Sequence, residues 1–207
     1  MPFIGNKPAS VPLTSADIAD SIITSAKIVD GTIVNADINA SAAIAGTKLS
    51  GAGKVLQVVS ATKTDTQSFT SATFADVTGL SLSITPSSAS SKILVFGYTL
   101  VAWDSANAKI GINLVRGATN ILVGDAAGSK LRVSGFTYTS TANNGLFSLP
   151  FNYLDSPSTT SATTYKIQAN NLDGAGTVYI NRSFTDTDNA TFGRGASTIT
   201  AMEISAW

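Results

Sequence analysis

The sequence contains neither cysteine nor histidine. The absence of cysteine excludes disulfide bonds and thiol catalysis, and it leaves the redox compartment undetermined. The absence of histidine excludes catalytic triads that use an imidazole base, and it removes a ligand found in most zinc sites. The sequence therefore lacks the side chains on which thiol catalysis, imidazole-based triads and most zinc sites depend.

Charge is also scarce. Charged residues make up 13% of the 207 residues, with 13 basic and 13 acidic side chains and a formal net charge of zero. A solvated monomer usually carries more charge, so we expect sister subunits to cover much of the surface. Balanced charge argues against a nucleic-acid-binding protein, which needs a basic patch.

Long apolar runs are absent as well, although mean hydropathy is +0.22. The most apolar segment, residues 93–103, has about half the ~20 residues that a membrane helix needs. Lys92 and Asp104 bound it. We therefore expect no membrane insertion.

The carboxylates do not suggest a catalytic pair. Glu203 is the single glutamate, and aspartates occur mostly in turn sequences such as Asp155-Ser156-Pro157 and Asp173-Gly174. A glycosidase needs two carboxylates that flank one bond. Scattered aspartates more often shape and solvate loops, so we expect no catalytic residue.

Two motifs resemble ligand sites without matching them. The run GDAAGSK (124–130) has three residues between its glycines where a phosphate loop has four, and a strand-like sequence follows it. Asp186, Asp188 and Asn189 offer oxygen ligands for calcium, but their spacing matches no known calcium loop. We expect no cofactor and no metal ion.

An apolar residue recurs at every fifth position between residues 14 and 50. The positions are Ile18, Ile23, Ile28, Ile33 and Ile38 and, after an insertion of one residue, Ile44 and Leu49. A five-residue step keeps side chains on one side of neither a helix nor a strand. The backbone must therefore turn within each repeat, with Asp20-Ser21 and Asp30-Gly31 as turns and Thr24, Ser25 and Asn35 as caps of single helical turns.

Residues 14–53 are thus predicted to form a shaft. So few aliphatic side chains cannot offset the entropy of ordering the segment within one chain, so several copies must bury these isoleucines together. The alternative is a disordered linker, because Ser, Ala, Asp and Thr fill the spacing, but disorder does not explain the regular isoleucines.

Residues 1–13 contain Pro2, Pro8 and Pro12, which favour an extended arm. An arm before a shaft suits docking to another protein. A frayed terminus is the alternative interpretation.

From residue 54 to 207, β-branched and aromatic runs alternate with turn residues, which predicts a mostly β domain of short antiparallel strands. The expected strands are 54–61, 73–84 with a break at Gly79, 92–103, 108–116, 119–124, 130–140 with a bulge at Ser134-Gly135, 145–154, 163–170, 176–183 and 197–205. This number of strands suffices for two packed sheets, and an antiparallel jelly-roll β-sandwich is the most economical arrangement.

Several of these runs resemble a known family. They are VLQVVSATKTDT (55–66), FADVTGLSLSITPSSASSKILV (74–95), LVRG (114–117), LDSPSTTSATTYKIQ (154–168), VYINRS (178–183) and ITAMEI (199–204), together with the MPFIGN opening and the I-x-D-G-T-I repeat. They resemble phage tail-fibre and related virion structural proteins of marine and cyanobacterial phages. The resemblance covers nearly the whole chain, and it rests on strand and turn sequences.

The resemblance implies a homotrimeric head, similar to the C1q and tumour-necrosis-factor jelly rolls, on a shaft whose N-terminal arm attaches to a tail, baseplate or capsid protein. It implies a virion protein assembled in the cytoplasm of a bacterial host. Two functions follow as hypotheses: a fibre that binds a host surface glycan or protein without turnover, and a non-adhesive head fibre, decoration protein or baseplate adaptor.

Receptor contact is expected at two loops of the head, 104–108 and 184–190, because loops tolerate changes of side chain that strands do not. The residues assigned to it are Trp103, Asp104, Asn107, Asp186, Asp188 and Asn189, with Tyr179 as a second aromatic ring for stacking on a sugar. Aromatic residues at strand ends more often serve packing, which is the alternative for Trp103 and Tyr179.

Overall fold

In a computed structural model of the chain, the described residues are 23–29, 31–39, 42, 54–106, 108–138 and 143–205. The chain divides into two units, Met1–Ser50 and Gly51–Trp207. The arm at residues 1–13 and the expected turn at Asp20-Ser21 lie outside the described residues.

The described part of the first unit repeats a ten-residue backbone pattern. It contains two 3-10 turns, η2 (Ser25–Lys27) and η3 (Asn35–Asp37). Backbone hydrogen bonds close a turn at every fifth residue, namely Lys27 N to Thr24 O, Thr32 N to Val29 O, Asp37 N to Val34 O and Ala42 N to Asn39 O, at 2.8 to 3.1 Å. The prediction that the backbone turns within each repeat is therefore correct for these residues.

Of the expected caps, Thr24 directly precedes η2, and its carbonyl oxygen accepts the hydrogen bond from Lys27 N. The other two occupy different positions. Ser25 and Asn35 lie inside η2 and η3. Asp37 caps the second turn from its far end, because its Oδ2 accepts a hydrogen bond of 2.8 Å from the backbone N of Val34. Gly31 has φ of 81°, a left-handed conformation that glycine adopts without steric cost.

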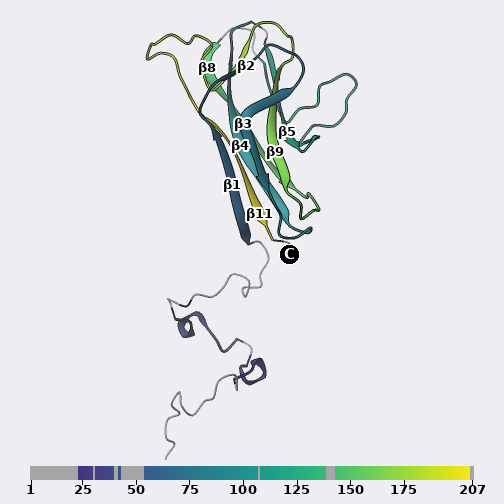
Figure 1. The fold of residues 1–207 in the computed structure, drawn as a ribbon, viewed down its shortest axis with the longest axis vertical. Coiled ribbons are helices and arrows are strands. Elements are labelled where there is room, and N and C mark those ends of the chain that lie inside the picture. The colour runs from purple at the N-terminus through teal and green to yellow at the C-terminus, as the bar shows by residue number, and fades with distance from the viewer. Residues whose placement is uncertain are drawn as a thin grey trace, which may run out of the picture. The chain divides into compact units, whose positions relative to one another are not determined.

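The second unit is a sandwich of two antiparallel sheets (Figure 1). Sheet A contains β1 (Val55–Lys63), β2 (Gln67–Phe69), β4 (Lys92–Trp103), β8 (Asn143–Asp155), β10 (Val178–Ile180) and β11 (Ser197–Ile204). Sheet B contains β3 (Ala75–Ile84), β5 (Lys109–Arg116), β6 (Thr119–Ile121), β7 (Gly135–Tyr138) and β9 (Thr163–Asn171).

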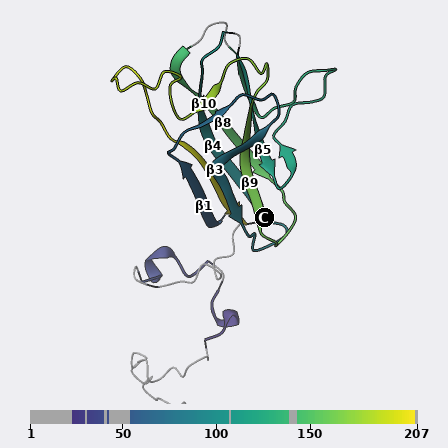
Figure 2. The same cartoon turned by 45° about the horizontal axis from the view of Figure 1, so that its top comes forward.

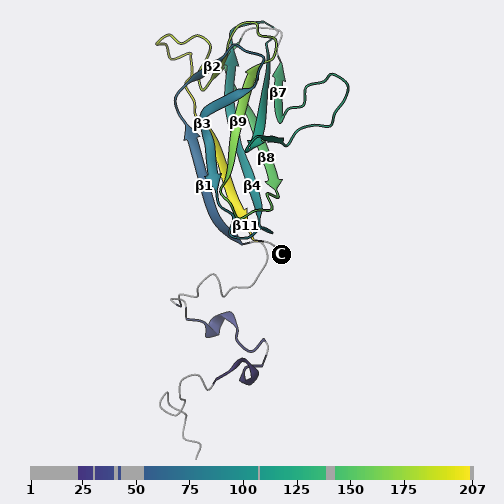
Figure 3. The ribbon, with the colours of Figure 1, turned by 45° about the vertical axis from the view of Figure 1, so that its right-hand side comes forward.

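The long strands run β1-β11-β4-β8 in sheet A and β3-β9-β5 in sheet B, with β6 and β7 on the outer side of β5. Successive long strands thus cross between the sheets, in the order of a jelly roll. Figure 3 shows β1, β4 and β11 in one layer behind β3 and β9. The two ends of the unit lie side by side, because Ser205 N donates to Lys54 O at 2.9 Å.

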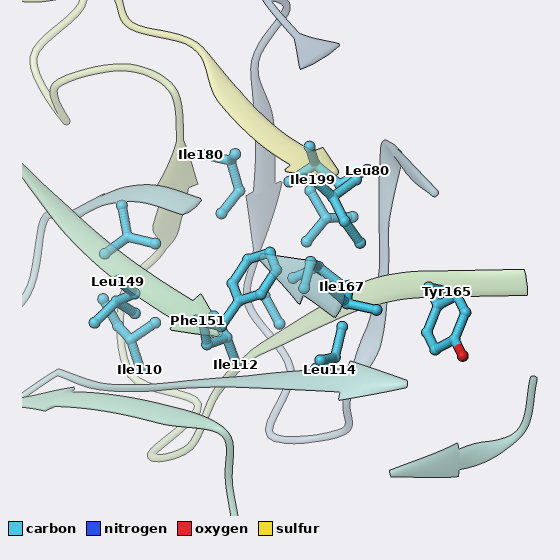
Figure 4. Packing of buried hydrophobic residues seen from close by; sticks show 14 of the residues in the cluster. Leu80, Ile110, Ile112, Leu114, Leu149, Phe151, Tyr165, Ile167, Ile180 and Ile199 are labelled. Carbon is cyan, nitrogen blue, oxygen red and sulfur yellow. The ribbon is translucent and has the colours of Figure 1, made fainter. Parts of the chain in front are cut away.

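Buried and exposed side chains alternate along the strands, as expected for strands with one face in a core. In β11, every second residue from Ser197 onward is buried and the residues between are partly exposed. The buried sets of both sheets meet in one core that includes Leu80, Ile112, Phe151, Ile167 and Ile199 (Figure 4). The predicted break at Gly79 is confirmed: its φ is 87°, and the register of β3 against β9 shifts between Asp76 and Ser81.

Some strand predictions are wrong in part. The strand expected at 119–124 ends at Ile121, and the one expected at 176–183 covers only Val178–Ile180. Residues 130–134 belong to a loop, and the expected bulge at Ser134-Gly135 is absent because β7 begins only at Gly135. Ser134 binds β5 instead: its N donates to Ile112 O at 2.9 Å and its Oγ accepts from Leu114 N at 2.8 Å. The short strand β2 was not predicted, since Gln67–Phe69 is too brief to show a period.

A buried ionic cluster joins the two sheets. Asp155 of β8 is 4% exposed and accepts hydrogen bonds from Arg116 Nη1 of β5, at 2.9 Å to each oxygen, and from the Tyr165 hydroxyl of β9 at 2.6 Å. Burial, and then the hydrogen bond to Asp155, raise the pKa of Tyr165, so its hydroxyl remains a donor. The cluster ties sheet A to sheet B through three side chains.

Glu203 gives the fold a pH-dependent contact. It is fully buried, with its oxygens 2.6 Å from Gln57 Nε2, 2.7 Å from Ser87 N and 2.6 Å from Ser87 Oγ. Burial alone would raise the pKa of this carboxyl, but hydrogen bonds from Gln57 and Ser87 to the charged form outweigh burial and place the pKa below 4.5.

Because the folded pKa lies below the unfolded value, this stabilisation is complete above about pH 4.5 and is lost as the pH falls through the folded pKa. We expect Glu203→Gln to cost about 1.5–3 kcal/mol at pH 7, the range for hydrogen bonds to a charged group. The difference from the unmodified protein should shrink below pH 4 in urea titrations. A difference that is constant from pH 7 to pH 3 would contradict this role.

Candidate functional site

The loop that follows β10 is closed at its base like a hairpin. Arg182 pairs with Arg194 in an antiparallel bridge, and Ser183 N donates to Gly193 O at 3.0 Å. Asn181, the residue before Arg182, is fully buried and has φ of 63°. Its Nδ2 donates a hydrogen bond to Lys63 O at 2.8 Å. Asparagine tolerates this left-handed conformation better than most residues. The buried base therefore fixes where the exposed loop 184–192 leaves the head (Figure 2).

A chain of polar contacts links this loop to the end of β4. Asp104 accepts hydrogen bonds from Thr177 N at 2.7 Å and from the Tyr179 hydroxyl at 2.8 Å. The Arg182 guanidinium lies 3.9 Å from the centre of the Tyr179 ring, an attractive cation–π contact. The structure thus brings together the end of β4 and the base of the loop after β10.

The chain of contacts continues to the tip through Asp186. Arg194 binds Asp186 with two nitrogens, at 2.6 Å from Nη2 to Oδ2 and 3.0 Å from Nε to Oδ1, and Arg182 Nη1 lies 3.6 Å from Oδ2. Asp186 therefore holds the loop closed against its own base. Sequence reasoning missed Arg182 and Arg194, although their placement on either side of the predicted aspartates was a signal for ion pairing.

The other predicted contact residues differ in burial and in hydrogen bonding. Trp103 is 1% exposed, and its ring centre lies 4.9 Å from that of Phe147, so it packs in the core and offers no ring to a ligand. Asn189 Oδ1 accepts from the N and hydroxyl of Thr191 at 2.9 Å, which shapes the turn. Asp188 is exposed. Asn107 lies outside the described residues.

The loop encloses a shallow hollow of about 320 Å³. Its lining is Asp186, Thr187, Asp188, Asn189, Phe192, Gly193 and Arg194. A partly buried phenylalanine beside amide, hydroxyl and carboxylate groups can bind a sugar through stacking and hydrogen bonds. Among the described residues no group of three or more Asp or Glu side chains is placed to hold a metal ion. The hollow thus combines one aromatic ring with amide, hydroxyl, carboxylate and guanidinium groups.

The second candidate surface is the row of isoleucines in the repeat. Ile23 and Ile33 are each 54% exposed, and Ile28 and Ile38 are 37% and 40% exposed. Residues ten apart have matching exposure because the backbone turns repeat with the same period. Ile18, Ile44 and Leu49 of the same pattern lie outside the described residues. No helix within the described ranges has the length and apolar character to cross a bilayer.

Comparison with known proteins gives no family. No family model matches the sequence, and no curated protein is significantly similar to it. Solved structures to which the chain is similar include those of infectious bursal disease virus, Gt and Gx strains, with TM-scores of 0.37 and 0.35 and identities of 11% and 10%. These matches cover 72% and 73% of this chain but 42% and 39% of the viral chains, so the chain spans about two fifths of their length.

A third similar structure is the tripod from the baseplate of bacteriophage Tuc2009, with a TM-score of 0.31 and 13% identity over 94% of this chain and 84% of that one.

Proposed function

We propose that this protein is a non-catalytic structural component of a phage virion, a homotrimeric fibre whose head attaches the particle to a host surface. The observation that carries the proposal is the row of isoleucines at every fifth residue, exposed on a backbone that repeats every ten residues. Three copies can bury such rows against one another, as narrow fibre shafts do. The resemblance of its strand and turn sequences to phage fibre proteins supports the same function.

The loop 182–194 is the proposed contact with the host, through a surface glycan or protein. Its tip at residues 186–191 is exposed, yet the ion pairs of Asp186 and the buried Asn181 position the loop firmly. Three copies on one particle would turn a weak contact into firm attachment, because each further engagement is intramolecular.

A charge reversal at the tip tests this contact. Asp188→Lys should lower adsorption of particles to host cells at least about tenfold, because each of three copies loses a contact of about 1 kcal/mol. The melting temperature should stay unchanged, since Asp188 is exposed. Asp125→Lys, a change at an aspartate that is also exposed but lies on another loop, is the matched control. Equal adsorption of both variants would move the contact away from this loop.

The alternative is a non-adhesive component, such as a head fibre, decoration protein or baseplate adaptor. One observation favours it: both oxygens of Asp104 and of Asp186 are bound within the chain, which leaves fewer groups free for a receptor. Purified protein that fails to bind host cells, but still joins particles, would select this alternative.

The N-terminal arm is proposed to attach the fibre to a tail, baseplate or capsid protein. Deleting residues 1–13 should abolish incorporation into particles and leave trimer formation intact, because the proline-rich arm has little apolar surface to hold subunits together. Immunoblots of purified particles measure incorporation. Particles that still carry the truncated protein would place the attachment elsewhere.

A further inference from the structure

One outer face of the head carries a single charged side chain, Lys92, in its last row beside Ile204. The rest of this face is formed by side chains that point away from the core on four neighbouring strands of sheet A. On β1 they are Val55, Leu56, Val58, Ser60 and Thr62, and on β11 they are Thr198, Thr200, Met202 and Ile204. On β4 they are Leu94, Phe96, Tyr98 and Leu100, and on β8 they are Leu146, Ser148, Pro150, Asn152 and Leu154. None of these side chains is charged. We call them the uncharged face. Lys92, at its border, donates to the Ser156 hydroxyl at 2.7 Å.

The register of the strands places apolar side chains of this face next to one another. One row across the four strands consists of Val58, Met202, Leu94 and Leu154, which are paired in that order. Val58 and Leu154, at the two ends of the row, are 53% and 55% exposed. Large apolar side chains that are contiguous and this exposed are unusual on the surface of a monomer.

The outer face of sheet B differs. There Lys166 of β9 binds Asp76 of β3 at 2.8 Å, Gln168 donates to the other oxygen of Asp76 at 2.8 Å, and Ser81 and Ser83 are exposed. Both faces belong to one sandwich and follow the same alternation, so the need to fill a core does not explain the difference. The charged and polar residues of sheet B lie over β3 and β9, whereas Phe136 and Tyr138 are exposed on its edge strand β7. The contrast with sheet A therefore holds for these two long strands.

We infer that the uncharged face packs against the same face of other copies of this chain, so that three heads meet around a common axis. The inference deepens the proposed function and rests on its trimer. β1 begins at Val55, six residues after Leu49 of the repeat, so association of the repeats would raise the effective concentration of the heads for one another. A surface with one charge at its border also meets its own copy with little repulsion between like charges, and it offers little to a charged partner of another kind.

The size of the face suits this role. Each outward residue covers about 4.8 by 6.6 Å of sheet, so the face measures roughly 600 Å². A standard interface buries about 800 Å² per partner. Side-chain relief and the neighbouring Phe147, which is 39% exposed, supply further contact area.

Radical footprinting of tyrosines in the full chain tests the inference. Tyr98 lies on the uncharged face and is 37% exposed, whereas Tyr138 of β7 in sheet B is 52% exposed. In a single head the two rings should be labelled at similar rates. In the assembled protein we expect Tyr98 to be labelled at least about fivefold more slowly than Tyr138, because the core of an interface excludes water.

Light scattering on the same sample separates the possible failures. A trimer in which Tyr98 and Tyr138 are labelled alike would overturn the inference and leave the trimer of repeats standing. A monomer would overturn the proposed trimer and this inference with it.

A matched pair of exposed serines gives the second readout. Ser60→Asp places a charge on the uncharged face, and Ser83→Asp places the same charge on the outer face of sheet B. Both changes leave the core untouched. Ser60→Asp should raise the labelling of Tyr98 several-fold, and Ser83→Asp should not change it. Equal labelling in both variants would contradict the inference.

Discussion

Replacing Ile28 and Ile38 together by aspartate is expected to shift the protein from trimers towards monomers. Burying a fully exposed isoleucine contributes about 1.5–3 kcal/mol. Ile28 and Ile38 are 37% and 40% exposed, so the six side chains of a trimer contribute roughly 4–7 kcal/mol on assembly. Aspartate loses this contribution and adds like charges that would face one another across the shaft. Sedimentation velocity at micromolar concentration measures the change.

The head should survive this change, because residues 54–205 bury a core of their own. Near-ultraviolet circular dichroism of the buried Trp103 and Tyr165 reports on its packing. The matched control is Ala26→Asp with Ala36→Asp, which keeps the ten-residue spacing and adds the same charge at exposed positions off the isoleucine row. If the control dissociates as readily as the isoleucine variant, general charge repulsion and not the isoleucine row governs assembly.

Asp155→Ala is expected to give the largest loss of stability within the head, about 3 kcal/mol. Breaking a buried ion pair by removing one partner costs about 3–5 kcal/mol. We expect the lower end of that range because the Arg116 side chain is 32% exposed and water can replace part of the contact. The buried Tyr165 hydroxyl would lose its acceptor, which adds to the cost.

Urea unfolding at a fixed protein concentration measures this loss. Tyr165→Phe should cost about 1–2 kcal/mol, since it removes one hydrogen bond and leaves the ion pair in place. The exposed Asp125→Ala is the control and should change stability by less than about 0.5 kcal/mol. An Asp155→Ala variant within about 1 kcal/mol of the unmodified protein would show that the cluster does not tie the sheets together.

Much of the fold could be predicted from the sequence where side chains alternate over a long strand. The strand at 92–103 matches its prediction at both ends, since Ile93, Val95 and Val101 mark one buried face. The loop 122–134 could not be predicted because Leu131 and Val133 imitate this alternation while they lie outside the core. The β5 backbone prefers Ser134 as a partner, a long-range contact that no local pattern reveals.

The candidate site was harder to predict than the fold. The sequence indicates the loop 184–190 through its polar composition, but not which of its aspartates is free. Asp186 is held by Arg194, eight residues away, and Asp104 by Tyr179, seventy-five residues away, whereas Asp188 is exposed. Trp103 ends a strand, as expected, yet Phe147 of β8 covers it. Such pairings depend on the register of strands distant in sequence.

Sedimentation equilibrium of the unmodified chain tests the central claim most directly, because the exposed isoleucine row is proposed to exist for assembly. The account predicts a single species of three chains, each of 21.2 kDa, that persists on dilution through the micromolar range. A stable monomer of 21.2 kDa at those concentrations would contradict it.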